Sequence, residues 1–385
     1  MVEWKKLEEV CEILDSQRKP VAKEERSQGI YPYYGANGIQ DYVSSYIFDG
    51  TFLLMGEDGS VINKDKSPVL HWTEGRIWVN NHAHILKENE RALLRYLYYS
   101  LQCTDVSDIV RGVPPKINQA NMRNILIPIP SLSEQSRIVS ILDTFTSSIS
   151  NLKQQIEERR KQYEFLLDKL YYTNKLELLE ASERGVVCVK TLDEIGTFIR
   201  GKRFVRTDIV EEGVPCIHYG DMYTYYGVCA EKTPTFLTKE KAEKLRFAKK
   251  GDVVIVAAGE NDIDIGVGVA WLGEEDVVVH DACFIFKHNM NPKYLSYFMR
   301  SMNYHLQIRM GVVDGKICSI SAKELGRTLA PVPSLQAQSR IVSILDTFEQ
   351  SIANLEEQLA MREKQYEYYR NQLLTFEGEE ERGKT

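Results

Sequence analysis

Residues 128–145 read PIPSLSEQSRIVSILDTF, and residues 331–348 read PVPSLQAQSRIVSILDTF. The two stretches match at 15 of 18 positions, at a fixed offset of 203 in a chain of 385 residues. An internal repeat with so long a period indicates duplicated domains related by pseudo-twofold symmetry rather than a solenoid. The sequence therefore predicts one structural unit that is present twice.

Each repeat is predicted to open a long helix with an apolar seam. A Pro-x-Pro stop precedes each helix, and the apolar positions that follow are spaced three and four residues apart in alternation, which is typical of a heptad seam. Two equal seams in one chain can pair with each other, and the pseudo-twofold favours an antiparallel pair. The arginine within each seam is expected to set the register, as polar seam residues can. The seam positions are Leu142, Phe145, Ile149, Leu152, Ile156, Arg159, Tyr163 and Leu166 in the first helix, and Leu345, Phe348, Ile352, Leu355, Leu359, Arg362 and Tyr366 in the second.

The regions upstream of the two helices are also related, although more loosely. WKKLEEVCEI at 4–13 resembles VKTLDEIGTF at 189–198, VNNHAHIL at 79–86 resembles VVHDACFI at 278–285, and LLRYLYYSLQ at 93–102 resembles YLSYFMRSMN at 294–303. The last pair predicts a short amphipathic helix in each half. The globular parts are therefore expected to share a scaffold but not a surface.

The expected fold class is α+β, with two α/β domains related by pseudo-twofold symmetry and separated by a pair of long antiparallel coiled-coil helices. The expected segments are a first domain at 1–130, a central helix and linker at 131–185, a second domain at 186–330, and a distal helix with an acidic, disordered tail at 331–385. The chain has no run of eighteen apolar residues and no N-terminal hydrophobic signal segment, so a cytoplasmic protein is expected. Seven cysteines without a C-x-x-C pair predict reduced thiols rather than a disulfide framework.

The order of a variable domain, a PIPS-x-x-EQ-x-RIV-x-ILD-x-F helix, a second variable domain and a second such helix resembles the DNA specificity (S) subunit of Type I restriction-modification enzymes. The resemblance covers the whole chain, and the second copy departs from the pattern at Ala337, where the first has Glu134. It implies two target-recognition domains, each reading one half of a bipartite site in double-stranded DNA, and helices that separate these domains like a ruler. It also implies that two methyltransferase (M) subunits dock on the helices and that restriction/translocase (R) subunits join the complex. S-adenosylmethionine, ATP and magnesium are then expected on the partner subunits, and no cofactor is expected on this chain.

Two other interpretations stay open at this point. One is a specificity subunit of a methylation-only or related restriction system, and the other is a coiled-coil adaptor that does not bind DNA. A self-contained nuclease or methyltransferase would need an active-site motif. The single Pro-Pro pair, in VPPK at 113–116, does not match the [Asn/Asp/Ser]-Pro-Pro-[Tyr/Phe/Trp] motif of adenine methyltransferases, and GVVDGKI at 311–317 is one residue short of a phosphate-binding loop.

No catalytic and no metal-binding residue is predicted, and a non-catalytic recognition subunit is the favoured interpretation. His82 and His84 are two residues apart, a spacing that places both on one face of a strand. The sequence shows no third ligand near them, so a structural role is expected for both histidines.

The net charge of −7 argues at first against nucleic-acid binding, because lysine and arginine provide the phosphate contacts. Much of the acidic excess lies in residues 331–385, however, and basic residues cluster at 200–206 and 241–250 of the second domain. Polar, basic and aromatic loop residues are the candidates for base and phosphate contacts. They are Tyr34, Asn37, His71, Arg76, Asn81, Arg111, Lys116 and Gln119 in the first domain, and Arg200, Lys202, Arg203, His218, Tyr219, Asp221, Asn261 and Lys316 in the second.

Overall fold

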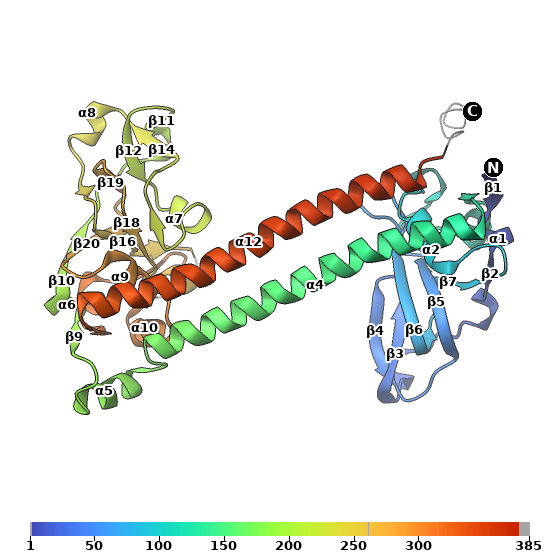
Figure 1. Ribbon diagram of the computed structural model, residues 1–385, viewed down its shortest axis with the longest axis horizontal. Helices are drawn as coiled ribbons and strands as arrows, with labels where there is room; N and C mark the ends of the chain where they lie inside the picture. Colours follow the sequence, from blue (N-terminus) through green and yellow to red (C-terminus); the bar gives the residue numbers. More distant parts are fainter. Residues whose placement is uncertain (1, 261, 314, 377–385) are drawn as a thin grey trace. The chain divides into compact units, whose positions relative to one another are not determined.

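The computed structural model describes residues 2–260, 262–313 and 315–376, and Figure 1 shows its ribbon. The chain divides into two compact units, one formed by residues 1–153 with 357–385 and the other by residues 154–356. There are two long helices, α4 (Leu132–Leu170) and α12 (Leu335–Leu374), and each has one part in the first unit and the other part in the second. The candidate Asn261 and the predicted acidic tail at 377–385 lie outside the described residues.

The first unit is built on a six-stranded sheet with the order β2-β7-β5-β6-β3-β4. All neighbouring strands are antiparallel except β3 and β6, which are parallel. A separate pair of antiparallel strands, β1 and β8, leads into the unit and out of it. The elements are β1 (Glu3–Lys6), α1 (Leu7–Val10), β2 (Cys11–Ile13), β3 (Gln28–Gly35), β4 (Gly38–Val43), β5 (Phe48–Gly56), β6 (Leu70–Val79), β7 (Ala83–Glu88), α2 (Leu94–Leu101), α3 (Gln119–Arg123) and β8 (Leu126–Ile129).

The second unit contains two five-stranded sheets, with the orders β10-β20-β16-β18-β13 and β11-β14-β12-β19-β15, and two small sheets, β17-β21 and β22-β9. Its strands are β9 (Val189–Thr191), β10 (Gly196–Arg200), β11 (Ile209–Val210), β12 (Val214–Ile217), β13 (Cys229–Ala230), β14 (Thr235–Leu237), β15 (Phe247–Ala248), β16 (Val253–Val256), β17 (Ala258–Gly259), β18 (Gly268–Trp271), β19 (Val277–Val279), β20 (Cys283–His288), β21 (Cys318–Ser319) and β22 (Leu329–Pro331). Its shorter helices are α5 (Lys175–Glu183), α6 (Leu192–Ile195), α7 (Asp221–Thr224), α8 (Lys239–Ala242), α9 (Pro292–Phe298), α10 (Met302–Ile308) and α11 (Ala322–Gly326).

The strand order shows that the two units share a scaffold. In the first unit β2, β7, β5 and β6 lie side by side, and β10, β20, β16 and β18 follow the same order with the same antiparallel pairing. Continuous apolar runs such as VVIV in β16 are buried along their whole length, which is typical of central strands. The prediction of two related α/β domains is confirmed.

The register of the strands corrects the sequence alignment by one residue. The His82 carbonyl accepts from the Glu57 amide in the first unit, and the Ala282 carbonyl accepts from the Ala257 amide in the second, so these segments correspond at an offset of 200, which the pairing of Leu53 with Leu86 and of Val253 with Phe286 also fits. The alignment of VNNHAHIL with VVHDACFI used an offset of 199. Apolar runs alternate in similar ways at either offset, so only the backbone pairing distinguishes them.

The residues of the repeat make the same contacts in both units. Gln135 is buried, accepts from the Leu93 amide at 2.9 Å and donates to the carbonyls of Arg91 and Pro130. Gln338, also buried, accepts from the Asn291 amide at 2.8 Å and donates to the Pro333 carbonyl. In each unit the glutamine therefore attaches the first turn of a long helix to the chain segment before α2 or α9.

A second shared contact lies two turns further along each helix. The Asp143 carboxylate accepts from Arg95 at 2.7 Å and from the Tyr99 hydroxyl, both on α2. The Asp346 carboxylate accepts from the Tyr297 hydroxyl at 2.6 Å and pairs with Lys293, both on α9. These contacts relate α2 to α9 at an offset of 198, three residues away from the sequence alignment of the two helices.

Within each unit, the two long helices pack against each other in antiparallel directions. In the first unit the ring of Phe145 stacks on Tyr369 at 5.3 Å, and Lys153, eight residues later, pairs with Glu363 at 2.9 Å. In the second unit Arg160 pairs with Glu356, and the Tyr163 hydroxyl, three residues later, donates to Glu349 at 3.2 Å. In both units the residue number of the partner on α12 falls as the residue number on α4 rises, as expected for antiparallel helices.

The seam arginines contact aromatic rings of the opposite helix. Arg362 lies over Phe145 at 5.7 Å in the first unit, and Arg159 lies over Phe348 at 5.5 Å in the second. The predicted seam positions are all buried or half-buried: Leu142, Phe145, Ile149, Leu152, Ile156, Arg159, Tyr163, Leu166, Leu345, Phe348, Ile352, Leu355, Leu359, Arg362 and Tyr366. Across the part of the chain that the structure describes, no helix is long and apolar enough to cross a membrane.

Replacing Gln135 by alanine should lower the free energy of unfolding by about 1–3 kcal/mol, because buried backbone partners would lose their hydrogen bonds. The Leu93 amide donates a hydrogen bond to Gln135, so in the variant its hydrogen should also exchange faster with deuterium. The matched control is Gln154→Ala, whose side chain is exposed and bonds Glu158. Equal unfolding midpoints for the two variants, measured in urea, would contradict this role of Gln135.

Candidate nucleic-acid interface

The hairpin between β3 and β4 carries Asn37, which is exposed, and Tyr34, which is half-buried. Burial raises the pKa of the Tyr34 hydroxyl. His71, from β6, bonds the Ala36 carbonyl through Nε2 at 2.9 Å. His71 therefore holds the hairpin, and Asn37 is the residue that the hairpin presents to solvent.

Two other candidates of the first unit have neighbours of their own. Arg76, on β6, pairs with Asp49 at 3.0 Å and lies over the ring of Tyr46 at 4.8 Å. Asn81 lies exposed in the turn between β6 and β7, where its carbonyl accepts from Arg18 at 3.4 Å. Arg76 can reach phosphate only by leaving Asp49, whereas the amide of Asn81 is available for a contact.

The loop before α3 contains Arg111 and Lys116, and Gln119 is the first residue of α3. The amides and carbonyls of Arg111 and Lys116 bond each other at 2.8 and 2.9 Å, which closes the loop into a narrow hairpin. Lys116 pairs with Glu57 at 3.2 Å, and Gln119 donates to Asp15 at 2.9 Å. Gln119 thus supports the loop from within, while Arg111 is exposed at its edge.

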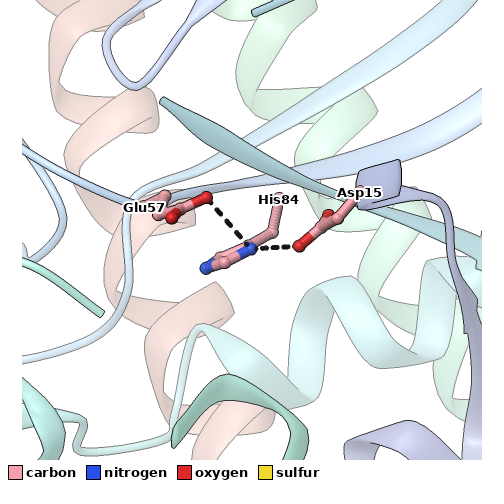
Figure 2. Close-up of side chains that lie close together, drawn as sticks. All are labelled: Asp15, Glu57 and His84. Carbon is pink, nitrogen blue, oxygen red and sulfur yellow. Dashed lines mark hydrogen bonds and ion pairs between the residues drawn. The ribbon is translucent and has the colours of Figure 1, made fainter. Parts of the chain in front are cut away.

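The contacts of Lys116 with Glu57 and of Gln119 with Asp15 belong to a polar network around His84. His84 lies on β7, and its side chain is buried. Figure 2 shows the His84 ring between the carboxylates of Asp15 and Glu57. His84 Nδ1 lies 2.6 Å from Asp15 and 3.6 Å from Glu57, and Nε2 lies 2.9 Å from the Ile117 carbonyl. Both ring nitrogens of His84 therefore face acceptor oxygens.

The carboxylates of this network are stabilised by neighbouring donors. Burial by itself would raise the pKa of the Asp15 carboxyl, but the hydrogen bond and charge of His84, the Ile85 amide and Arg18 together hold that pKa below its usual value. Arg18 also pairs with Glu57 at 2.5 Å. The network connects the segment after β2, the end of β5, β7 and the loop before α3.

Asp15, Glu57 and His84 are of the residue types that bind divalent cations, and their ligand atoms lie within 4.8 Å of one another. Two cationic side chains, Arg18 and Lys116, already neutralise the two carboxylates. A cation would have to displace the Arg18 guanidinium, which is mostly buried, from both acids. The group therefore fits a charge-compensated hydrogen-bond network better than a metal site.

In the second unit, Arg200, Lys202 and Arg203 lie at the end of β10. Arg200 donates to the Asp281 carbonyl and Lys202 to the Lys244 carbonyl, each at 2.9 Å. Arg203 is exposed, and among the described residues it pairs with no carboxylate. Since carbonyl contacts leave the charges of Arg200 and Lys202 uncompensated, all three cations can attract phosphate.

Beside this basic segment lies an aromatic cluster that contains two of the candidates, His218 and Tyr219. Their rings are 4.5 Å apart, and both contact the ring of His280 at 5.1 and 5.4 Å. Burial lowers the pKa of His218 and of His280. Both ring nitrogens of His280 are bonded within the fold, to the Phe204 carbonyl and the Ala282 amide, and His218 Nδ1 accepts from the Gly220 amide. The cluster therefore offers flat ring faces and the Tyr219 hydroxyl, which suits contact with bases.

The side chains of Asp221 and Lys316 differ in whether they are free to contact DNA. Asp221 accepts from the His218 amide at 3.3 Å and from the Thr235 hydroxyl at 2.9 Å, so its carboxylate fixes the turn after β12. Lys316 is exposed in the loop that corresponds to residues 111–117.

His280 and Arg18 were not predicted as site residues. His280 corresponds to Asn80 at the offset of 200, and both side chains accept from the amide two residues later, His82 in one unit and Ala282 in the other. This correspondence could have been found in the sequence only with the correct register. Arg18 lies far in sequence from Glu57, and no sequence pattern connects the two.

Replacing Asp15 by asparagine should lower the free energy of unfolding at pH 7 by about 1–3 kcal/mol. Because the folded pKa of Asp15 is depressed, its stabilisation is present above about pH 4 and is lost as the pH falls through the folded pKa. The difference between variant and parent should therefore shrink in acid. The control is Asp108→Asn, an exposed carboxylate of the same unit. A pH-independent difference in urea unfolding would contradict this account.

Comparison with known proteins agrees with the duplicated fold. The family described as "Type I restriction modification DNA specificity domain" matches residues 1–159 and again residues 186–361. A putative type I restriction enzyme specificity subunit from Haemophilus influenzae is 32% identical, over 97% of this chain and 96% of its own length. The EcoR124I/EcoR124II specificity subunit of Escherichia coli is 28% identical over 75% of this chain and 72% of its own length.

The fold is also that of a solved structure, the S subunit of a Type I restriction-modification system from M. genitalium. The two align with a TM-score of 0.62 at 17% identity, over 98% of this chain and 96% of that one. The family matches cover both halves of the chain, in agreement with the two units of the structure. This chain belongs to the family of Type I restriction-modification DNA specificity subunits.

Proposed function

We propose that each unit of this specificity subunit reads a different half of a bipartite site in double-stranded DNA. The observation that carries the proposal is one scaffold with two sets of loop side chains. The turn Asn80-Asn81-His82 of the first unit corresponds to His280-Asp281-Ala282 of the second, at matching backbone positions. Since base edges are distinguished by donors and acceptors at fixed places, different side chains at one backbone position read different bases.

We further propose that the two helix starts bind two copies of one partner. Residues that are identical in both repeats and exposed in both helices are not required by the core of either unit. They are Leu132, Ser136, Arg137, Ser140 and Thr144 in the first repeat, and Leu335, Ser339, Arg340, Ser343 and Thr347 in the second. Two equal surfaces within two diverged units fit two equal partners, which are methyltransferase subunits in this proposal.

Catalysis then belongs to the partner subunits. The methyltransferase subunits would bind S-adenosylmethionine and methylate adenine, and restriction/translocase subunits would use ATP and magnesium. In this proposal the chain supplies the DNA sequence that the complex recognises. Adenine must leave the base stack to react, so a subunit that fixes the register on the duplex also determines which base is exposed.

The direct test is a map of methylated adenines in host DNA with and without this chain. We expect one bipartite motif to lose methylation when the chain is absent and to regain it on complementation. Exchange of residues 2–130 for those of a relative should change one half of the motif only. A methylation pattern that does not depend on the chain would contradict the proposal.

The docking surfaces can be tested with Leu132→Lys and Leu335→Lys, whose side chains are 49% and 59% exposed. Each substitution should remove one methyltransferase subunit from the reconstituted complex, and the double variant should remove both, as seen by native mass spectrometry. The matched controls are Ser133→Lys and Gln336→Lys, at neighbouring exposed positions where the repeats differ. A full complement of partners on the double variant would refute the two surfaces.

A further inference from the structure

Exposed large apolar side chains lie in two corresponding loops, one before α3 and one before α11. In the first unit, residues 111–116 are all exposed, and Val113, followed by two prolines, is 100% exposed. In the second unit, Met310, Val313 and Ile317 are 93%, 65% and 62% exposed. Single exposed apolar residues are common, but their presence in both of these corresponding loops requires an explanation.

Both loops are held in place at their base. In the first, the Gly59 amide bonds the Pro115 carbonyl at 2.9 Å, and the Ile117 amide bonds the Glu57 carbonyl at 2.9 Å. His84 holds the Ile117 carbonyl from the buried network. In the second, the amides and carbonyls of Val313 and Ser319 bond each other at 2.8 and 3.1 Å. Backbone hydrogen bonds therefore fix the described residues at the base of each loop.

The two loops retain few residues in common. Residues 111–117 read RGVPPKI and residues 311–317 read GVVDGKI, so valine, lysine and isoleucine recur at an offset of 200. Ile117 is buried in the core, which explains its presence. By its backbone pairing with Ser319, Val313 takes the place of Arg111, which pairs with Lys116, so the two valines are near but not at one backbone position. Both valines are exposed, and neither core explains an apolar residue there.

Charge indicates which molecule covers these tips. Arg111 lies beside Val113, Lys116 and Lys316 each follow the valine of their loop by three residues, and Arg309 precedes Met310. Within the described residues, Arg111 and Lys316 pair with no carboxylate. An exposed apolar side chain with cationic side chains on both sides suits a DNA duplex. The cations can contact phosphates while the apolar side chain enters between base pairs. A protein partner would not require cations on both sides.

We propose that the tips at Val113 and at Val313 with Met310 are apolar wedges that enter the base stack, one in each half-site. This inference rests on the proposed reading of DNA and extends it to the opening of the duplex. Proteins that insert apolar side chains unstack the step and kink the duplex. A step opened in this way lowers the cost of extruding the neighbouring adenine for methylation.

The wedge is tested in the complete methyltransferase complex with Val113→Ser. The probe is a duplex that carries the methylation motif mapped in the host, with 2-aminopurine at successive steps of each half-site. The parent complex should raise 2-aminopurine fluorescence at one step of each half-site. Val113→Ser should abolish the rise in one half-site only and slow methylation there about tenfold, while Val113→Leu should retain both.

Two controls separate a wedge from other effects. Val186→Ser removes an equally isolated valine, 68% exposed, and should change nothing. Arg111→Ala should reduce the slope of log affinity against log salt by about 1, whereas Val113→Ser should leave that slope unchanged.

Three results would overturn the proposal. The first is an unchanged fluorescence rise in Val113→Ser. The second is loss of methyltransferase subunits from this variant in native mass spectrometry, which would make the tip a protein contact. The third is absence of any motif for the parent complex, which would remove the proposed function as well. A variant that selects the motif normally without the fluorescence rise supports the wedge.

Discussion

The structure depends on how each unit holds the first turns of a long helix. Gln135 and Gln338 are buried amides that gain hydrogen bonds only if the helix start, the preceding proline segment and the loop before α2 or α9 are in one fixed arrangement. A buried amide without partners costs about 1–3 kcal/mol, so misplaced starts are disfavoured. Asp143 and Asp346 add a second fixed point two turns later, which determines the direction of each helix as well as its origin.

These contacts explain why some residues are identical in the two repeats. The other identical residues are exposed to solvent and need a different explanation. Gln135, Leu142 and Asp143 recur because each unit needs them for packing. Leu132 and Arg137 recur although solvent surrounds them, so packing within the chain does not account for them. The repeat thus combines two constraints on one helix, an inner face that fits the unit and an outer face that is the same in both copies. The loops have neither constraint and have diverged.

The sequence predicted those features that depend on the order and spacing of nearby residues. The offset repeat revealed the duplication, and the spacing of Leu142, Phe145 and Ile149 revealed a seam. The strand register was missed by one residue because apolar runs such as VVIV look alike at neighbouring offsets. The network of Asp15, Glu57 and His84 was also missed, since its members come from three separate segments that only the folded sheet brings together. The prediction that His82 and His84 lie on one face of a strand is wrong, because His82 lies in the turn before β7 and bonds Asp58 near the surface, whereas His84, on β7, is buried in the core.

The negative net charge is compatible with a DNA-facing surface because charge acts locally. Two acids of the first unit are neutralised within the fold: Glu57 by Arg18 and Lys116, and Asp41 by Arg26. Arg111, Arg203 and Lys316 have no such partner in the described ranges. Over distances beyond about 10 Å salt screens the remaining acidic groups, many of which lie in residues 331–385. A phosphate near the loops therefore meets unpaired cations, and the sum over the whole chain is a poor guide to what the loops bind.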